Sequence, residues 1–204
     1  MIRNIFANHG ITITEEQEQK LNQYYDLLID WNNKINLTSI VEYEEVIWKH
    51  FLDSAFFVSC DKVDLKEKKK VLDLGTGAGF PGMVLAILCP DYEFVLADSL
   101  NKRIEFLKVV INRLQIHNVS VIHGRAEELG RNENFRNQFD YVVSRAVAEL
   151  PVLLEYCIPF VKKGGYFVSY KSRRLDEEIE NADNALNMLY TKYEKKYKYE
   201  LEYD

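Results

Sequence analysis

The stretch that decides the fold runs from residue 71 to residue 82 and reads Val71-Leu72-Asp73-Leu74-Gly75-Thr76-Gly77-Ala78-Gly79-Phe80-Pro81-Gly82. Its first residues are mostly apolar and predict a short buried strand, and Gly82 opens a predicted helix that runs to about Leu88. A turn with three glycines spaced two residues apart joins them. A strand, a glycine-rich turn and a helix in this order let backbone approach a nucleotide-like ligand closely.

A dinucleotide cofactor such as NAD fits this pattern only in part. Residues 77–82 match a G-x-G-x-x-G dinucleotide fingerprint, and Asp98 follows at about the 20-residue distance that an NAD site requires. The NAD fingerprint, however, begins where the strand ends, and here the strand ends at Gly75. Counted from Gly75, the third glycine position holds Phe80, which is too bulky for close packing of the helix on the strand.

Asp73 favours a different ligand. A carboxylate near the end of an apolar strand needs a hydrogen-bond donor when it is buried. It would organise the amides of the loop or meet the ammonium group of an amino acid, whereas a pyrophosphate would repel it. The series Asp73, Gly75, Gly77 and Gly79 is therefore interpreted as a loop for S-adenosylmethionine (SAM), with NAD binding and a purely structural turn as the alternatives.

The residues after the loop alternate between predicted strands and helices. The strands are expected at 70–74, 93–97, 119–123, 139–144 and 166–171, and the helical segments at about 82–88, 102–115, 127–129, 150–160 and 176–189. A sheet-edge strand is expected at 197–203, where apolar and charged residues alternate. This order predicts an α/β fold, a doubly wound and mostly parallel sheet whose ligands bind beyond the carboxyl ends of the strands.

The N-terminal part is expected to be helical. We predict a helical extension over residues 1–65 and a main domain over residues 66–204, with a charged linker at 61–70. Thr14 and Gln17 have the spacing of a capping box, and an apolar stripe at helical spacing continues from there to Trp31. A second helix is expected over about 44–58. The stripe is interpreted as core rather than as a ligand site.

Composition excludes several classes of protein. The 204 residues hold 26 Lys and Arg against 32 Asp and Glu, and the net charge of −6 argues against loose, sequence-independent binding of nucleic acid. No apolar run approaches the ~20 residues of a membrane span, and no signal-peptide core follows Arg3. Three separated cysteines and four histidines without metal-ligand spacing predict a cytoplasmic protein with reduced thiols and no metal site.

Residues at the predicted strand ends define a candidate site. Asp98 would accept hydrogen bonds from both hydroxyls of a ribose, or would cap the helix that follows it. The backbone amides of Ala126 and Glu127 would contact an adenine edge, or would simply begin a helix. Arg145 leaves the fourth strand and must face the cleft or a partner acid, because a buried unpaired arginine is unfavourable.

Further cations follow the third and fifth strands. They would hold the phosphates of an RNA substrate or would be solvated surface charges, and they are Arg125, Lys171, Arg173 and Arg174.

The bound cofactor limits the chemistry. SAM carries an electrophilic methyl group, so catalysis of its transfer is mostly proximity and orientation. The chain has Ser144-Arg145-Ala146-Val147 after the fourth strand, where enzymes that methylate exocyclic amines carry an Asn/Asp-Pro-Pro-aromatic run, and it has no Pro-Cys nucleophile. No general base is evident. An acceptor with a free lone pair, such as N7 of guanine, needs none.

These motifs together resemble those of one family. Residues 73–82, 98–103 (Asp-Ser-Leu-Asn-Lys-Arg) and 144–148, with Asn36-Leu37-Thr38 and residues 50–54 upstream, resemble the bacterial small-subunit ribosomal RNA methyltransferase G family over about residues 20–175. The resemblance implies a class I methyltransferase fold and SAM-dependent methylation of guanine N7 in 16S ribosomal RNA. It implies SAM contacts at Gly75, Phe80, Ala126, Glu127 and Arg145.

The resemblance also carries expectations about roles and partners. Arg145 is the candidate catalytic residue, without a general base, and His50 and Asn36 are candidates for closing the site. The expected partner is 16S ribosomal RNA or the small ribosomal subunit, with no membrane, no metal and a monomeric protein. The family's fold ends with a further strand and a basic tail, which are expected to be missing after Asp204.

Two functions of other classes stay open. A non-catalytic SAM-binding ribosome-assembly factor would need the same loop. An NAD-dependent reductase of the short-chain type would need a Tyr-x-x-x-Lys motif, and the sequence contains none.

Overall fold

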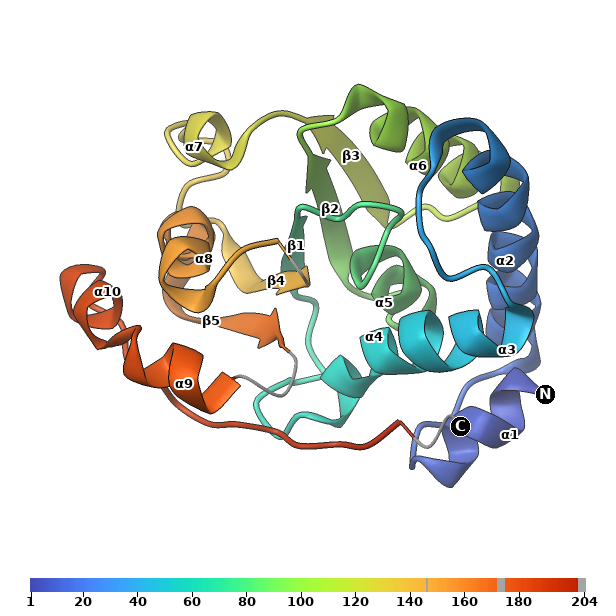
Figure 1. The fold of residues 1–204 in the computed structure, drawn as a ribbon, viewed down its shortest axis with the longest axis horizontal. Helices are drawn as coiled ribbons and strands as arrows, with labels where there is room; N and C mark the ends of the chain where they lie inside the picture. Colours follow the sequence, from blue (N-terminus) through green and yellow to red (C-terminus); the bar gives the residue numbers. More distant parts are fainter. Residues whose placement is uncertain (146, 172–174, 202–204) are drawn as a thin grey trace.

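A single parallel sheet organises the molecule. The computed structural model describes residues 1–145, 147–171 and 175–201. Five strands pair in the order β3-β2-β1-β4-β5, and every pair is parallel (Figure 1). Their bounds are β1 (Lys70–Leu74), β2 (Glu93–Asp98), β3 (Val119–His123), β4 (Phe139–Arg145) and β5 (Val161–Tyr170). The predicted doubly wound parallel sheet is confirmed, and the strand order reverses between β1 and β4.

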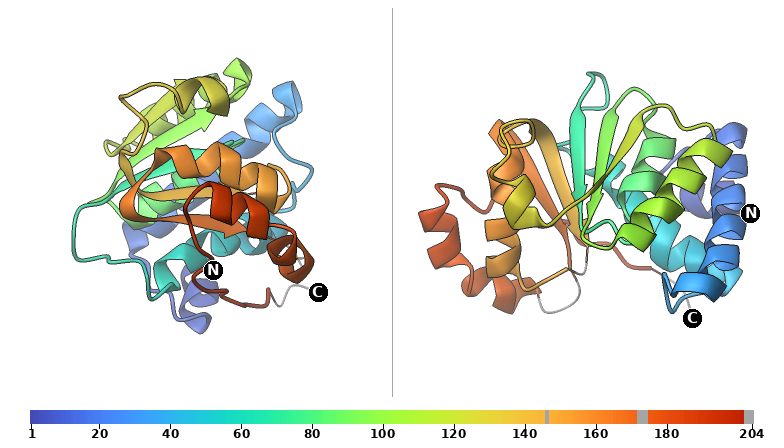
Figure 2. Two further views of the ribbon diagram at one scale, coloured as in Figure 1. Left: turned by 90° about the vertical axis from the view of Figure 1, so that its left-hand side faces the viewer. Right: turned by 90° about the horizontal axis from the view of Figure 1, so that it is seen from above.

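The sheet separates two hydrophobic cores, because neighbouring residues of a strand point to opposite faces. In β1, Val71 packs in the core on one face, whereas Leu72 and Leu74 pack in the core on the other. The first core is covered by the N-terminal helices with α5 (Gly82–Leu88) and α6 (Asn101–Arg113), and the second by α7 (Ala126–Leu129), α8 (Leu150–Cys157) and the short helix η3 (Ile158–Phe160) (Figure 2).

The N-terminal helices belong to the first core. Their bounds are α1 (Ile2–Asn8), α2 (Glu15–Ile35), α3 (Tyr43–Val46), η1 (Ile47–Leu52), α4 (Asp53–Ala55) and η2 (Phe56–Ser59). The last four run on without a break, as expected for 44–58, although η1 is a π-helix. The predicted capping box is present at Thr14 and Gln17. Buried side chains from these helices join those of the sheet in one cluster, and the domain boundary near residue 65 stays a prediction.

The C-terminal part differs from the sequence prediction in two places. The helix expected over 176–189 is broken into α9 (Leu175–Glu180) and α10 (Asp183–Met188). The break buries Ala182 completely in a cluster with Leu150 and Leu154 of α8. β5 also starts earlier than expected, at Val161, and includes Gly164 and Gly165. Its register with β4 shifts between Phe139, which pairs with Val161, and Tyr141, which pairs with Tyr166.

The edge strand expected at 197–203 was a wrong prediction for the residues that the structure describes. Residues 191–201 form no regular element, and residues 202 and 203 lie outside the described residues. Side-chain contacts with the helix η2 and the linker hold this segment. Tyr199 stacks on Phe56 with ring centroids 3.7 Å apart, and Lys195 Nζ lies 3.0 Å from Asp61 Oδ2. The alternation of apolar and charged residues therefore serves side-chain anchoring along this path.

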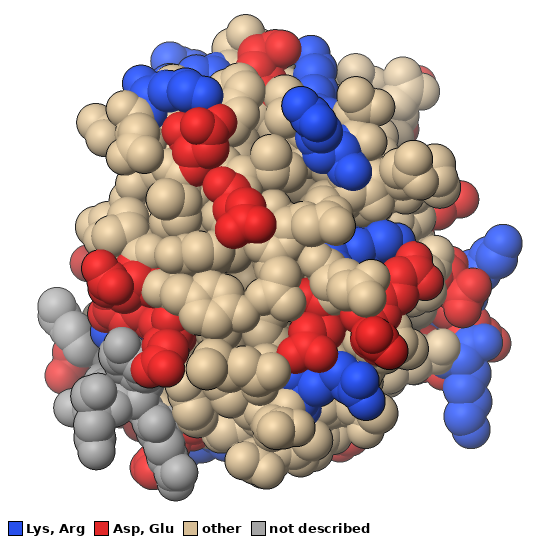
Figure 3. Space-filling view, turned by 90° about the vertical axis from the view of Figure 1, so that its right-hand side faces the viewer, with Lys and Arg blue, Asp and Glu red and all other residues tan. Residues whose placement is uncertain are grey.

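The outer face of the N-terminal helices carries mixed charge. Figure 3 shows acidic and basic side chains interspersed on this side of the molecule. On α2, Lys20 pairs with Glu16 and Lys34 with Asp30, at one-turn spacing. None of the described helices is both long and apolar enough to cross a membrane. Nor do the described residues bring together three or more His, Cys, Asp or Glu side chains that could hold a metal ion.

Candidate active site

The glycine-rich loop between β1 and α5 has backbone conformations that explain its glycines. Gly77 and Gly79 have positive φ angles of 61° and 102°, which side-chain-bearing residues rarely adopt. At Gly79 a Cβ atom would lie 2.9 Å from Leu107 and would collide with the hydroxyl group of Tyr24. At Gly77 a Cβ atom would meet nothing within 4 Å. Gly79 is therefore needed for packing, whereas Gly77 faces open space in which a ligand can approach the backbone.

Asp73 holds the loop together. Its Oδ2 atom accepts hydrogen bonds from the hydroxyl of Thr76 and from the amide of Gly82, both at 2.7 Å. The other oxygen, Oδ1, is buried and has no hydrogen-bond partner among the described residues. Burial raises the pKa of Asp73 to about 6, and the two hydrogen bonds and the charge of Arg145 oppose that rise. Of the two predicted roles, the structure shows the organisation of the loop, and one oxygen remains for a donor.

Asp98 at the end of β2 links the loop to α6. Its Oδ2 accepts from the amide of Gly77 at 2.9 Å, and its Oδ1 accepts from the amide of Leu100 at 2.9 Å. The Arg103 guanidinium lies 3.1 Å from Oδ2. The carboxylate is buried, and each of its oxygens has two acceptor positions. Asp98 thus shapes the loop beside the open side of Gly77, and its contact with a ribose stays a prediction.

The helix α2 also contacts the loop, which the sequence analysis missed. The hydroxyl of Tyr24 donates to the carbonyl of Ala78, and the Tyr24 ring stacks on Phe51 at 5.6 Å. Gln17 Nε2 donates to the carbonyls of Ile87 and Leu88, which end α5, at 3.0 and 3.1 Å. Tyr24 is part of the apolar stripe that was interpreted as core. Its phenol at a buried position was a signal of a polar partner, because buried tyrosine hydroxyls find one.

Arg145 at the end of β4 is inserted between the loop and the helices η1 and α4. Its Nη1 donates to Asp53 Oδ2 at 2.7 Å and to the carbonyl of Lys49 at 3.1 Å. Its Nη2 lies 3.2 Å from Nδ1 of His50, and its guanidinium carbon lies 5.2 Å from the centroid of the Phe80 ring. The side chain is 16% exposed. The structure thus identifies Asp53 as the acid that pairs with Arg145. The guanidinium of Arg145 also contacts the loop through the ring of Phe80.

The residues after β3 are more exposed. Arg125 and Glu127 lie on the surface at the start of α7, and Ala126 between them is half-buried. The amide of Gly124 donates to the backbone carbonyl of Asp98 at 3.1 Å, which brings the end of β3 beside the end of β2. The structure therefore places the predicted adenine contacts next to the predicted ribose contact.

The predicted rim cations have different surroundings. Lys171 Nζ donates to Glu178 Oε2 and to the carbonyl of Ala148, both at 2.6 Å, and its side chain is only 8% exposed. This placement does not favour the expected contact with an RNA phosphate. Arg173 and Arg174 lie outside the described residues.

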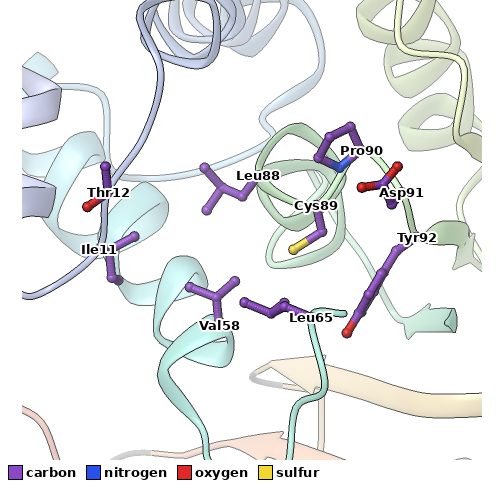
Figure 4. Close-up of a pocket in the computed structure, with 9 residues that line it drawn as sticks. All are labelled: Ile11, Thr12, Val58, Leu65, Leu88, Cys89, Pro90, Asp91 and Tyr92. Carbon is purple, nitrogen blue, oxygen red and sulfur yellow. The ribbon is translucent and has the colours of Figure 1, made fainter. Parts of the chain in front are cut away.

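The cavity in Figure 4 lies elsewhere. It is lined by residues from the connection between α1 and α2, from η2, from the linker and from the end of α5 and the segment between α5 and β2, among them Val58, Leu65 and Leu88, and has a volume of about 170 Å³. These residues lie near the amino end of β2. The candidate site lies at the opposite end of the strands, beyond the carboxyl ends of β1, β2 and β4.

The fold and the site define a class of protein. A parallel sheet in the order β3-β2-β1-β4-β5, with a glycine-rich loop after β1, is the Rossmann-like fold of class I methyltransferases. A SAM-dependent methyltransferase from Aquifex aeolicus superposes with a TM-score of 0.51 at 19% identity and covers 72% of this chain and 82% of its own. A precorrin-6y C5,15-methyltransferase from Geobacter metallireducens has a TM-score of 0.50 at 14% identity, with 68% of this chain and 70% of its own covered.

The sequence specifies the family within this class. Residues 17–200 match the family model for GidB, rRNA small subunit methyltransferase G. The ribosomal RNA small subunit methyltransferase G of Lachnoclostridium phytofermentans is 53% identical over 94% of this chain and 78% of its own length. The protein of the same description from Alkaliphilus metalliredigens is 52% identical over 88% and 74%. The chain belongs to the rRNA small subunit methyltransferase G family.

Proposed function

We propose that this chain is a SAM-dependent methyltransferase that methylates N7 of a guanine in 16S ribosomal RNA. Membership of the family supports the reaction and the substrate class. The observation that carries the proposal within the structure is the arrangement of Arg145, Phe80 and the open side of Gly77 around one loop. We propose further that the protein acts as a monomer in the cytoplasm.

The residues of the loop fit the cofactor. The orphaned and buried Oδ1 of Asp73 suits the ammonium group of a methionine moiety, and the open space at Gly77 suits close approach of a ligand to the backbone. We assign cofactor binding to Gly75, Gly77, Gly79, Phe80, Asp98, Ala126, Glu127 and Arg145. When bound, SAM supplies an electrophilic methyl group on a sulfonium centre.

The side chains near the loop orient rather than deprotonate. Nδ1 of His50 already contacts Arg145, and Asp73 is occupied with Thr76 and Gly82 through its Oδ2. The N7 atom of guanine is an acceptor with a free lone pair, so the reaction needs no general base. Arg145 is the candidate catalytic residue, because its remaining N–H groups can hold the cofactor or the base in line, and alignment is the main source of rate in such a displacement.

Contact with RNA would begin at the exposed cations. Arg125 lies on the surface next to the predicted adenine contacts, so it is the described residue best placed to hold a phosphate. The predicted contact of Lys171 would require that its ion pair with Glu178 open.

Methyl transfer measured with labelled SAM tests the proposal. Naked 16S ribosomal RNA and assembled small subunits are offered separately, and 7-methylguanine is detected by chemical cleavage of the product RNA. Label in 7-methylguanine that is lost with Arg145→Ala supports the proposal. SAM binding without transfer to either substrate would instead point to an assembly factor, and binding of NADH without SAM would overturn the cofactor.

A further inference from the structure

The side chain of Asn32 ties the end of α2 to the loop that follows it. Asn32 Oδ1 accepts hydrogen bonds from the amides of Leu37 and Thr38, at 2.6 and 2.8 Å. The backbone before them turns at Asn36, whose φ angle of 48° is left-handed and ends the helix. The result is a fixed position for the hydroxyl group of Thr38, which also accepts from the amide of Ile40 at 3.1 Å.

The fixed hydroxyl meets the ring of His50. Thr38 Oγ1 lies 2.9 Å from His50 Nε2, and on the other side of the ring Nδ1 lies 3.2 Å from Arg145 Nη2. An arginine guanidinium has donors and no acceptor. Nδ1 must therefore be unprotonated and accept from Arg145, which leaves the proton of a neutral ring on Nε2, from where it is donated to Thr38.

The surroundings of the ring keep it neutral and in place. His50 as a whole residue is 9% exposed, and its ring stacks on the Phe80 ring with centroids 4.4 Å apart and planes inclined by 16°. Burial and the nearby charge of Arg145 both lower the pKa of His50, to about 3. At neutral pH the ring is thus uncharged, and Nδ1 can accept a hydrogen bond from the guanidinium of Arg145.

The partners of Arg145 divide between its two terminal nitrogens. Asp53 and the carbonyl of Lys49 both accept from Nη1 and use its two hydrogens. His50 is the group that contacts Nη2 among the described residues. Two of the five N–H groups, one on Nη2 and one on Nε, have no partner among those residues. A planar group held at one nitrogen can still swing about that nitrogen, whereas contacts at two nitrogens fix its plane and hence the direction of the remaining donors.

We infer that His50 is a positioning residue for Arg145: Thr38 fixes its neutral ring, and Nδ1 fixes the plane of the guanidinium so that the unpaired N–H groups face the cofactor. The inference rests on the proposed function of Arg145. It assigns a role to the segment Asn36-Leu37-Thr38 and to His50 other than closure of the site. The N-terminal helices thereby help to set the geometry of the strand ends.

Two substitutions of His50 separate its two contacts. Asparagine places a carbonyl oxygen near the position of Nδ1 but does not reach Thr38, and glutamine reaches the position of Nε2 and leaves Nδ1 without a substitute. Both remove the stacked ring, so they form a matched pair. SAM is titrated calorimetrically into the wild-type chain and each variant, and thermal unfolding is recorded for the same samples. We expect His50→Gln to weaken SAM binding about tenfold relative to the wild-type chain. His50→Asn should keep most of the wild-type SAM affinity.

A double-mutant cycle with Arg145→Ala separates positioning from structure. We expect His50→Gln to have no further effect on SAM affinity once Arg145 is alanine, because its role is carried through that side chain. Thr38→Val, which keeps the shape and removes the hydroxyl, is expected to weaken SAM binding in the same direction and to a smaller extent. Equal loss from His50→Gln in both backgrounds, or equal loss in the Gln and Asn variants, would overturn the inference.

A spectroscopic measurement tests the ring without the cofactor. The ¹⁵N chemical shifts of His50 in the wild-type chain at neutral pH should be those of the tautomer protonated at Nε2. An imidazolium, or a ring protonated at Nδ1, would contradict the contact with Arg145. If the wild-type chain did not bind SAM, the proposed function would fail together with any role toward that cofactor. If the wild-type chain bound SAM but the effects of His50→Gln and Arg145→Ala were additive, the inference about His50 would fail and the proposed function would stand.

Discussion

Arg145 and Asp53 are 92 residues apart in sequence, yet Nη1 of one lies 2.7 Å from Oδ2 of the other. The pair joins the end of β4 to the helix α4 and is mostly buried, with side chains 16% and 17% exposed. Tyr199 donates to the second oxygen of Asp53 at 2.7 Å. A pair in such surroundings holds its members in place, and removal of one member leaves a poorly solvated charge.

This pair gives the first prediction. We expect Arg145→Ala to lower methyl transfer about 10- to 100-fold, because it removes the charge-assisted hydrogen bonds proposed to orient the ligand. We expect the free energy of unfolding to fall by about 3–5 kcal/mol, because Asp53 stays mostly buried without its counter-charge. Steady-state transfer to the RNA substrate and urea unfolding check the two values. The matched variant Asp53→Asn keeps Arg145 but removes its counter-charge, and we expect an intermediate loss of transfer. Loss of transfer that simply follows loss of folded protein would contradict the assignment of Arg145.

A second prediction compares two glycines of the loop. Gly79→Ala places a methyl group against Leu107 and Tyr24, so we expect it to lower the free energy of unfolding by about 2–4 kcal/mol. Gly77→Ala meets open space, so we expect only the conformational cost of about 1–2 kcal/mol from its φ angle of 61°.

Binding of SAM gives a further test of Gly77→Ala. Calorimetric titration should show that Gly77→Ala loses most of its SAM affinity while the chain stays folded, because the new methyl group occupies the space proposed for the ligand. Unchanged SAM affinity in folded Gly77→Ala protein would place the cofactor elsewhere.

A third prediction concerns pH. Burial raises the pKa of Asp73 to about 6 from its ordinary value of 3.8. The folded protein therefore binds more protons at this group than the unfolded chain between these values, and stability from Asp73 is present below the unfolded pKa and is lost as pH rises through 6. Asp73→Asn lacks this titration. We expect its unfolding free energy relative to wild type to rise with pH, by up to about 1.4 kcal/mol per pH unit.

His50 has the opposite sign. Its folded pKa of about 3 lies below its ordinary value of 6.5, so the unfolded chain binds more protons between these values. Wild-type stability from this group is lost as pH falls from 6.5 towards 3.

Because the contributions of Asp73 and His50 have opposite signs, each must be measured as a difference in unfolding free energy between wild type and the relevant variant, by urea unfolding at several pH values. A difference between wild type and Asp73→Asn that does not change with pH would refute the shifted pKa.

A fourth prediction separates Asp98 from its neighbour. Asp98→Ala leaves the amides of Gly77 and Leu100 without their acceptor and removes the predicted ribose contact, so we expect SAM affinity to fall about 10- to 100-fold. Arg103→Ala removes only the ion pair, since Arg103 is one-third exposed, and we expect at most a few-fold loss. Similar losses in both variants would show that Asp98 acts through Arg103 and not on the ligand.

Local patterns in the sequence determined much of the fold. Largely apolar segments that follow polar residues and end at a glycine predicted β1 at Lys70–Leu74 and β3 at Val119–His123 with their observed bounds. Side-chain spacing in a strand or helix is a property of a few consecutive residues, so it can be recognised without knowledge of the rest of the chain. The break at Ala182 and the irregular segment after residue 190 depend instead on contacts with α8 and η2, and local patterns were misleading there.

The candidate site divides along the same line. The sequence alone identified the glycine loop, the carboxylates Asp73 and Asp98 and the arginine Arg145, because each stands at a strand end whose position follows from local pattern. Only the tertiary structure decided what they contact: Asp53 and His50 for Arg145, and Tyr24 for the loop. These partners come from helices 54 to 95 residues away along the chain. Hydrogen bonds and ion pairs act over a few ångströms in space, so packing of the helices on the sheet selects the partners.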